Sequence, residues 1–128
     1  MAIPEPRTKA PLRWLLAVIM VGAGVAHFAS PEGFERIVPK FLPAPHLLVL
    51  MSGGFEILGG VGLLLARTRR LASLGLIALF VAVFPANINM ALNDIQPVAT
   101  HVPALVLWLR LPLQALLIAW AWWVGRAR

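Results

Sequence analysis

The sequence lacks cysteine altogether, and this absence removes a whole group of functions. Without a thiol, the chain cannot form a disulfide, a thiolate metal site, an iron–sulfur cluster or a dithiol redox relay from its own side chains. No metal or haem site is evident among the remaining residue types either. Any redox function would therefore need a bound cofactor.

Charge is also scarce, because only 12% of the 128 residues are charged while 60% are hydrophobic. The mean hydropathy of +0.85 is too high for an ordinary soluble domain. A net charge of +6 would suit nucleic acid, but the basic residues lie at the ends of apolar runs and form no stripe with interleaved aromatic residues. The composition therefore indicates a protein whose main partner is the lipid bilayer, with no nucleic-acid partner.

Four apolar runs are present, at residues 12–29, 47–66, 71–92 and 103–124. Each is long enough to cross the hydrocarbon core of a membrane. None shows the two-residue alternation of a barrel strand, so helices are expected. The sequence predicts an all-α fold, a single domain forming a membrane-spanning four-helix bundle, with an outer loop over 30–45.

The basic residues predict the orientation of the bundle. They form three clusters that a four-span topology places on one side: Arg7, Lys9 and Arg13; Arg67, Arg69 and Arg70; Arg126 and Arg128. Because basic residues favour the cytoplasmic side, both termini are predicted to be cytoplasmic and the protein to be a multi-pass protein of the cell inner (cytoplasmic) membrane. The turn at 67–70 is expected to be solvated, with no role beyond topology. A cleaved signal peptide would invert the remaining spans, so the first span is expected to be retained.

The outer loop is rich in proline, with Pro31, Pro39, Pro43 and Pro45. Proline cannot extend a regular helix and biases the preceding residue toward extended backbone. The loop is therefore expected to be either a structured lid over the bundle or a segment lying on lipid. Apolar residues such as Phe34 would give it a face for either role.

Two ionisable residues lie deep within the predicted spans. Each would cost about 2.5 to 3.5 kcal/mol to insert, so each is a candidate functional residue. Glu56 is about 14 Å along its helix and Arg110 about 10 Å from the outer surface. Opposite charges at similar depth favour an ion pair, and Glu56 and Arg110 are candidate catalytic residues.

Weaker polar residues converge on the same level. They are His27, a third candidate catalytic residue, and the candidate substrate-binding residues Asn87, Asn89, Gln114 and Ser52. Together they predict a pocket that opens outward. Each also has a structural interpretation: the amides bond across helices, and His27 is an interfacial residue. Because Asn87 and Asn89 are two residues apart, an unbroken helix cannot direct both inward.

Glycine and proline mark where the helices can approach or bend. Pro85 removes a backbone hydrogen bond and frees the carbonyl of Val81. Glycines beside Glu56 and before His27 would let neighbouring helices approach closely: Gly22, Gly24, Gly53, Gly54, Gly59, Gly60 and Gly62.

Several motifs together resemble the DoxX-like family of small integral membrane proteins. They are Ala26-His-Phe, Ser52-Gly-Gly-Phe-Glu56, Val83-Phe-Pro-Ala-Asn-Ile-Asn89 and Arg110-Leu-Pro-Leu-Gln114. This resemblance implies four helices and an association with quinone-reactive oxidoreductase systems, with partner subunits beside the chain.

Three hypotheses about function follow. The first is a protein that binds a quinone or another small amphipathic ligand in a membrane oxidoreductase system, with partner oxidoreductase subunits or as a homo-oligomer. The second is a stand-alone membrane enzyme, an isomerase or lyase, that uses Glu56 and His27 as an acid–base pair. The third is a non-enzymatic accessory subunit whose polar cluster fixes helix packing.

Overall fold

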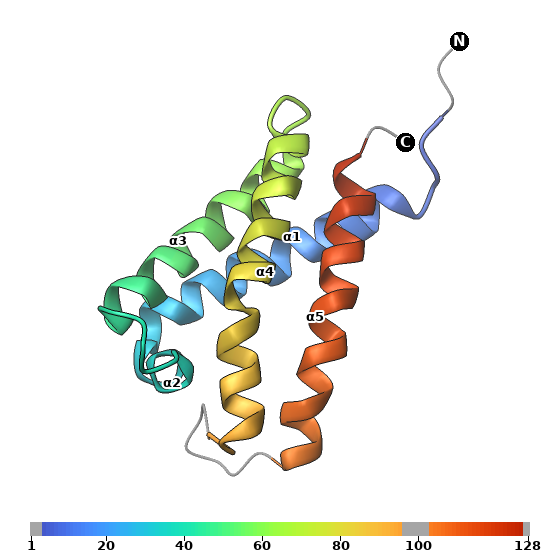
Figure 1. The fold of residues 1–128 in the computed structure, drawn as a ribbon. Coiled ribbons are helices and arrows are strands. Elements are labelled where there is room, and N and C mark those ends of the chain that lie inside the picture. Colours follow the sequence, from blue (N-terminus) through green and yellow to red (C-terminus); the bar gives the residue numbers. More distant parts are fainter. Residues whose placement is uncertain (1–3, 96–102, 127–128) are drawn as a thin grey trace.

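The computed structural model describes residues 4–95 and 103–126. It contains five helices, α1 (Lys9–Ala29), α2 (Pro31–Ile37), α3 (Pro45–Leu64), α4 (Arg69–Leu92) and α5 (Ala104–Gly125) (Figure 1). All except α2 are long and apolar enough to cross a membrane. The prediction of an all-α protein with four spans is confirmed, and the chain is a multi-pass membrane protein.

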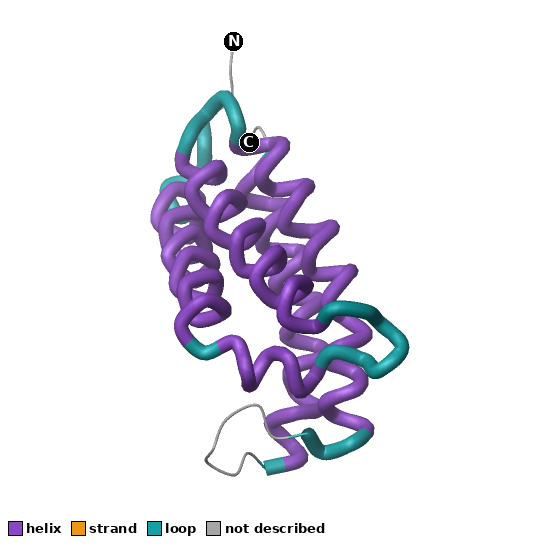
Figure 2. Tube along the Cα trace, turned by 90° about the vertical axis from the view of Figure 1, so that its left-hand side faces the viewer, coloured by secondary structure: helices purple, strands orange, loops and turns teal. Residues whose placement is uncertain are grey.

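The four long helices pack in a ring. The contacts run from α1 to α3, from α3 to α4 and from α4 to α5, and α5 returns to α1. This order leaves α3 diagonal to α5. The start of α1 and the end of α5 lie at one end of the bundle, here called the terminal end, and α2 lies toward the opposite end, here called the loop end (Figures 1 and 2).

The bundle is apolar on its outside as well as in most of its core, whereas a soluble protein has a polar surface. Large aliphatic side chains face outward, and Leu58 and Leu71 are 69% and 75% exposed. Polar side chains such as Ser73, Asn87 and Gln114 are buried between helices. A lipid-facing surface explains the exposed leucines, since lipid tails solvate them as well as a protein core does.

Glycine allows α1 and α3 to approach each other closely. A Cβ atom added at Gly53 would lie 2.6 Å from the Cβ of His27 and 2.9 Å from the carbonyl oxygen of Gly24. A Cβ at Gly60 would lie 2.9 Å from the carbonyl oxygen of Ala17. No larger residue fits between these backbones, so this face of α3 requires glycine.

A second face of α3 packs on α4 in the same way. A Cβ at Gly59 would meet the side chain of Leu76, and one at Gly62 would meet that of Ala72. Gly22 and Gly54, by contrast, have no such neighbour within 4 Å. The close-packing role predicted for the glycines is therefore confirmed for the others and wrong for these two.

Side chains fasten the helices at the terminal end. Arg13 Nε donates to the carbonyl of Val124 at 3.0 Å, and Trp120 Nε1 donates to that of Leu12 at 3.2 Å, which joins α1 to α5. Arg69 Nε donates to the carbonyl of Leu63 at 2.8 Å and so satisfies the end of α3. The turn at 67–70 thus does more than the solvated turn that was expected, because Arg69 also caps a helix.

The outer loop contains a short helix, α2, that was not predicted from the sequence. Pro31 occupies the first position of α2, where a helix does not need the backbone N–H that proline lacks. The prolines were expected to prevent a regular helix in this loop. Pro39 and Pro43 do lie outside the helices, but Pro45, like Pro31, begins one. The remaining boundaries differ from the expected ones by three residues or fewer at each end.

The glycine contact predicts a difference between two adjacent substitutions. Gly53→Ala should destabilise the protein by about 1 to 3 kcal/mol, because the new methyl group overlaps α1. Gly54→Ala is the matched control, since it brings the same helix propensity without a clash. Thermal unfolding in detergent should show a lower midpoint for Gly53→Ala alone, and equal midpoints would contradict the packing.

Candidate functional site

Two of the predicted catalytic residues meet, His27 on α1 and Glu56 on α3. His27 Nδ1 lies 3.4 Å from Glu56 Oε2, and both residues are buried. The same nitrogen lies 2.7 Å from the carbonyl oxygen of Ala23. A carbonyl only accepts, so Nδ1 carries the proton, and Nε2 of a neutral ring is left as the basic atom.

Glu56 has an oxygen without a hydrogen-bond partner. Its Oε2 atom is buried and receives no hydrogen bond from the described residues, because the His27 contact lacks hydrogen-bond geometry. An unsatisfied buried polar atom costs about 1 to 3 kcal/mol. Such an atom in a native protein calls for an explanation, and a bound donor from water or a ligand is the simplest one.

Arg110 does not form the predicted ion pair with Glu56. Within the described part of the chain, Glu56 is close to His27, and Arg110 makes no hydrogen bond or ion pair. The reason is topological, because Arg110 lies on α5, which is diagonal to α3. The predicted ion pair was wrong because the sequence does not reveal the order of the helices around the bundle.

Asn87 and Gln114 form a second polar cluster, between α4 and α5. Asn87 Nδ2 donates to Gln114 Oε1 at 3.2 Å, and Gln114 Nε2 donates to the carbonyl of Phe80 at 2.9 Å. Phe80 precedes Val81, whose carbonyl loses its helical donor at Pro85. These amides join two helices at this weakened turn, so the helix-bonding interpretation is confirmed, and ligand contact by them stays a prediction.

Asn89 faces a different direction from Asn87, as their spacing requires. Its Nδ2 donates to the carbonyl of Ile37 at 3.0 Å and so caps the last turn of α2. Ser52 is half-buried, and its hydroxyl makes no hydrogen bond to another described residue. The predicted polar ring is therefore divided: His27 with Glu56, Asn87 with Gln114, and Asn89 with α2.

Helix α2 covers the first of these groups. The ring of Phe34 stacks on the imidazole of His27, with 3.8 Å between ring centroids and 17° between planes. His46 Nδ1 lies 2.6 Å from Glu35 Oε1, and this hydrogen-bond contact ties α2 to the start of α3. With Asn89 holding its end on α4, α2 is fixed to three long helices, and the lid is the alternative that these contacts favour.

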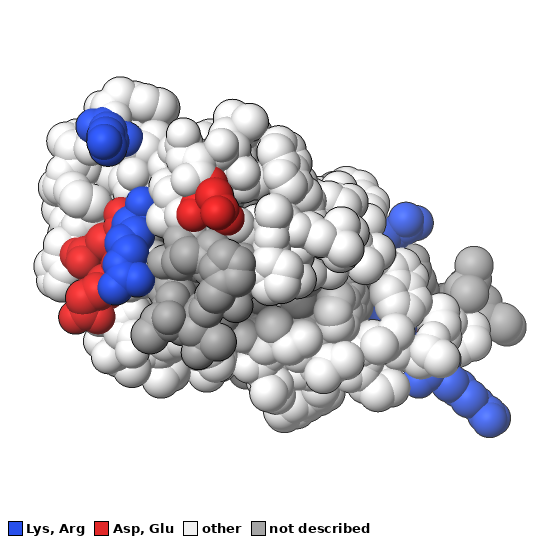
Figure 3. All heavy atoms as spheres, turned by 90° about the horizontal axis from the view of Figure 1, so that it is seen from below, with Lys and Arg blue, Asp and Glu red and all other residues white. Residues whose placement is uncertain are grey.

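The loop end carries charges of both signs. Seen along the bundle from this end, acidic and basic side chains lie beside one another (Figure 3). Acidic Glu32 and Glu35 and basic Arg36 all belong to α2. The surface above the lid therefore has no strong net field that would select a highly charged ligand.

Comparison with known families covers most of the chain. Residues 16–125 match the family described as Domain of unknown function (DUF8561). The chain belongs to this family. No curated protein and no solved structure matches it.

The arrangement places two proton-exchanging side chains next to each other within the bundle. Imidazole and carboxylate are the side chains most often used for general acid–base work, and here they touch with one oxygen unsatisfied. The stacked ring of Phe34 limits water on one side of the imidazole. Phe34 was expected only as part of an apolar face; its pairing with His27 depends on how α2 folds back, which no local sequence signal specifies.

The amide cluster predicts energetic coupling between α4 and α5. The substitutions Asn87→Leu and Gln114→Leu should each destabilise the protein, and their combined effect should differ from the sum by roughly 0.6 to 1.7 kcal/mol. Reversible unfolding in mixed detergent gives the free energy of unfolding of the wild type, the two single variants and the double variant. Ser52→Ala combined with Gln114→Leu is the control and should be additive; additivity for both pairs would contradict the hydrogen bond.

Proposed function

We propose that this membrane protein binds a small amphipathic ligand at His27 and Glu56, beneath α2, and exchanges a proton with it. The observation that carries the proposal is the buried Oε2 atom of Glu56, which lacks a donor beside a titratable imidazole. Buried ionisable groups within a membrane are expensive and are expected to be functional. A ligand hydroxyl would satisfy this oxygen.

A quinone system fits the donors and acceptors at this site, and the resemblance to DoxX-like proteins makes it our choice of ligand. Glu56 would accept a hydrogen bond from a quinol hydroxyl, and the Nε2 atom of His27 would face a second polar atom of the same ligand. When bound, a quinone would supply the redox chemistry that a chain without cysteine lacks. The ligand's apolar ring would match Phe34.

Each of the site residues would have a separate role. Glu56 would hold or release a proton at Oε2, and the basic Nε2 atom of His27 would take a proton from the ligand and release it toward the loop end, because His27 lies near that end of α1. Arg110, half-buried on α5, would contact a ligand directly instead of acting through Glu56. Asn87, Asn89 and Gln114 would set the helix positions that shape the site.

The cellular setting is part of the proposal. The basic clusters at the terminal end favour an inner (cytoplasmic) membrane protein with both termini in the cytoplasm. The ligand site would then lie toward the outer leaflet. Partner oxidoreductase subunits, or further copies of the chain, would pass electrons to or from the ligand, because the chain has no redox group of its own.

One contact favours a second candidate function, a stand-alone isomerase or lyase. His27 and Glu56, with polar atoms 3.4 Å apart, would offer a base and an acid to one bound substrate, and such an enzyme needs no electron acceptor. Turnover of a lipid-soluble substrate by the purified chain alone would distinguish this enzyme from a redox subunit.

Glu56→Gln tests the quinone proposal. The variant keeps the size of the side chain but replaces the carboxylate, so affinity for a short-chain benzoquinol should fall at least tenfold, roughly the value of one hydrogen bond to a charged group. Calorimetric titration of protein in phosphatidylcholine nanodiscs measures the binding.

Glu32→Gln is the matched control, because Glu32 is an exposed acid on α2 that does not touch His27. It should bind as the wild type does. Unchanged affinity in Glu56→Gln, or an equal loss in Glu32→Gln, would contradict the proposal and leave the accessory role as the better account.

A further inference from the structure

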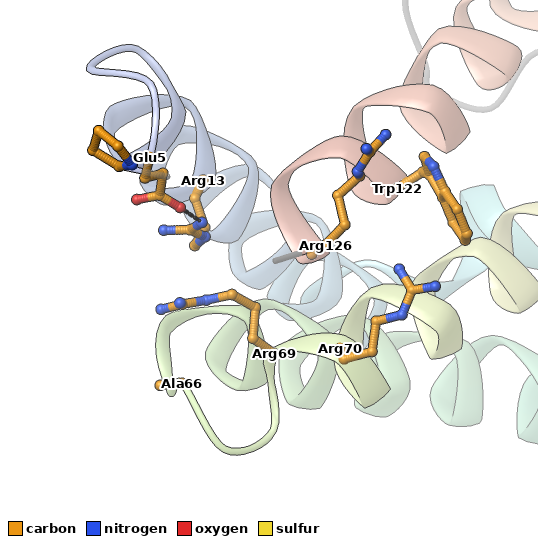
Figure 4. Close-up of a pocket in the computed structure, with 9 residues that line it drawn as sticks. Glu5, Arg13, Ala66, Arg69, Arg70, Trp122 and Arg126 are labelled. Carbon is orange, nitrogen blue, oxygen red and sulfur yellow. Dashed lines mark hydrogen bonds and ion pairs between the residues drawn. The ribbon is translucent and has the colours of Figure 1, made fainter. Parts of the chain in front are cut away.

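The terminal end of the bundle contains a second candidate site, far from His27 in the fold. It is an open pocket of about 970 Å³ between the ends of α1, α4 and α5 (Figure 4). Four arginines line it: Arg13, Arg69, Arg70 and Arg126. Arginine is the side chain best suited to bind phosphate, because its planar guanidinium offers several donors.

The pocket has an excess of positive charge. Glu5 is the one acidic residue in its lining, against four arginines, which leaves three charges uncompensated within the lining. Glu5 forms an ion pair with Arg13, and this hydrogen bond lowers the pKa of the Glu5 carboxyl. Since like charges gathered in one pocket repel, an anion in the pocket would stabilise them.

Several of these arginines are held in place by protein contacts. Arg13 is anchored on the carbonyl of Val124, and Arg69 on that of Leu63. The guanidinium of Arg70 lies over the ring of Trp122, 4.3 Å from its centroid. Each anchor uses only part of the guanidinium, so further N–H donors are available to a ligand. A site whose donors are already ordered loses less entropy on binding.

The position of the pocket indicates where its anion comes from. It lies where three spans reach the terminal end, the depth at which phospholipid headgroups border the hydrocarbon core. Trp122, which forms one wall, is 44% exposed, and tryptophan is typical of this interface. A lipid phosphate therefore needs no diffusion through water to reach the arginines, and its acyl chains would follow the apolar outer faces of the helices.

We propose that the pocket formed by Arg13, Arg69, Arg70 and Arg126 binds the phosphate of an anionic phospholipid and so ties the ends of α1, α4 and α5 together. The basic clusters then do more than orient the chain. The site is independent of the ligand proposed at His27 and Glu56, because it is formed by different residues at the other end of the bundle.

The double variant Arg70→Gln/Arg126→Gln tests the proposal. Both side chains are exposed and neither donates a hydrogen bond that holds the fold together in the described part of the chain. Wild-type protein in phosphatidylcholine nanodiscs containing a small fraction of phosphatidylglycerol should retain phosphatidylglycerol selectively, as read by native mass spectrometry. The double variant should retain at least tenfold less, since each basic residue near a membrane surface contributes roughly fivefold.

The matched control is Arg7→Gln/Arg67→Gln, which removes the same charge from exposed residues of the terminal end that do not line the pocket. It should retain phosphatidylglycerol nearly as the wild type does. An equal loss in both double variants would overturn the site in favour of general surface charge.

A second measurement separates a lipid from a free anion. Phosphatidylglycerol should raise the thermal unfolding midpoint of the wild type, and millimolar inorganic phosphate should not match it. Stabilisation by phosphate alone would overturn the lipid assignment. The variant Arg70→Lys/Arg126→Lys should restore part of the lost retention, and an absence of any restoration would contradict binding through charge.

Discussion

The close contact between α1 and α3 is the constraint on which the rest of the structure depends. Gly24 and Gly53 let the two backbones approach closely, and the same contact sets the Cβ of His27 against Gly53. Glu56 follows Gly53 by three residues, on the same side of its helix, and so meets the imidazole. Without this approach, a histidine near the end of α1 would not contact a carboxylate in the middle of α3.

The remaining polar residues then have distinct roles at three levels of the bundle. The amides of Asn87 and Gln114 join α4 to α5, and Asn89 holds α2 over the site. At the terminal end, Arg13 and Arg69 donate hydrogen bonds to backbone carbonyls at the ends of α5 and α3. Membrane helices gain little from burying apolar surface against each other, so small residues and polar contacts set the geometry instead.

The sequence predicts this fold well because lipid leaves few alternatives. Four long apolar runs in the membrane must be helices, and all four were found within a few residues of their positions. The site was predicted in part. His27 and Glu56 do meet, but the pair of Glu56 with Arg110 was wrong, because opposite charge and equal depth do not reveal which helices are neighbours. The stacking of Phe34 also depends on tertiary structure, as α2 is a short helix placed by its contacts.

The most direct test of the glycine contact uses the absence of cysteine from the chain. The pair His27→Cys/Gly53→Cys places two thiols on facing positions of α1 and α3, which reach disulfide distance once the helices move apart by about 1 Å, whereas His27→Cys/Gly54→Cys directs the second thiol away from α1. Mild oxidation in membranes, followed by quantification of the intramolecular disulfide, compares the two pairs. The first pair should cross-link far more than the second. Equal cross-linking, or cross-linking of the second pair alone, would contradict the packing that brings His27 to Glu56.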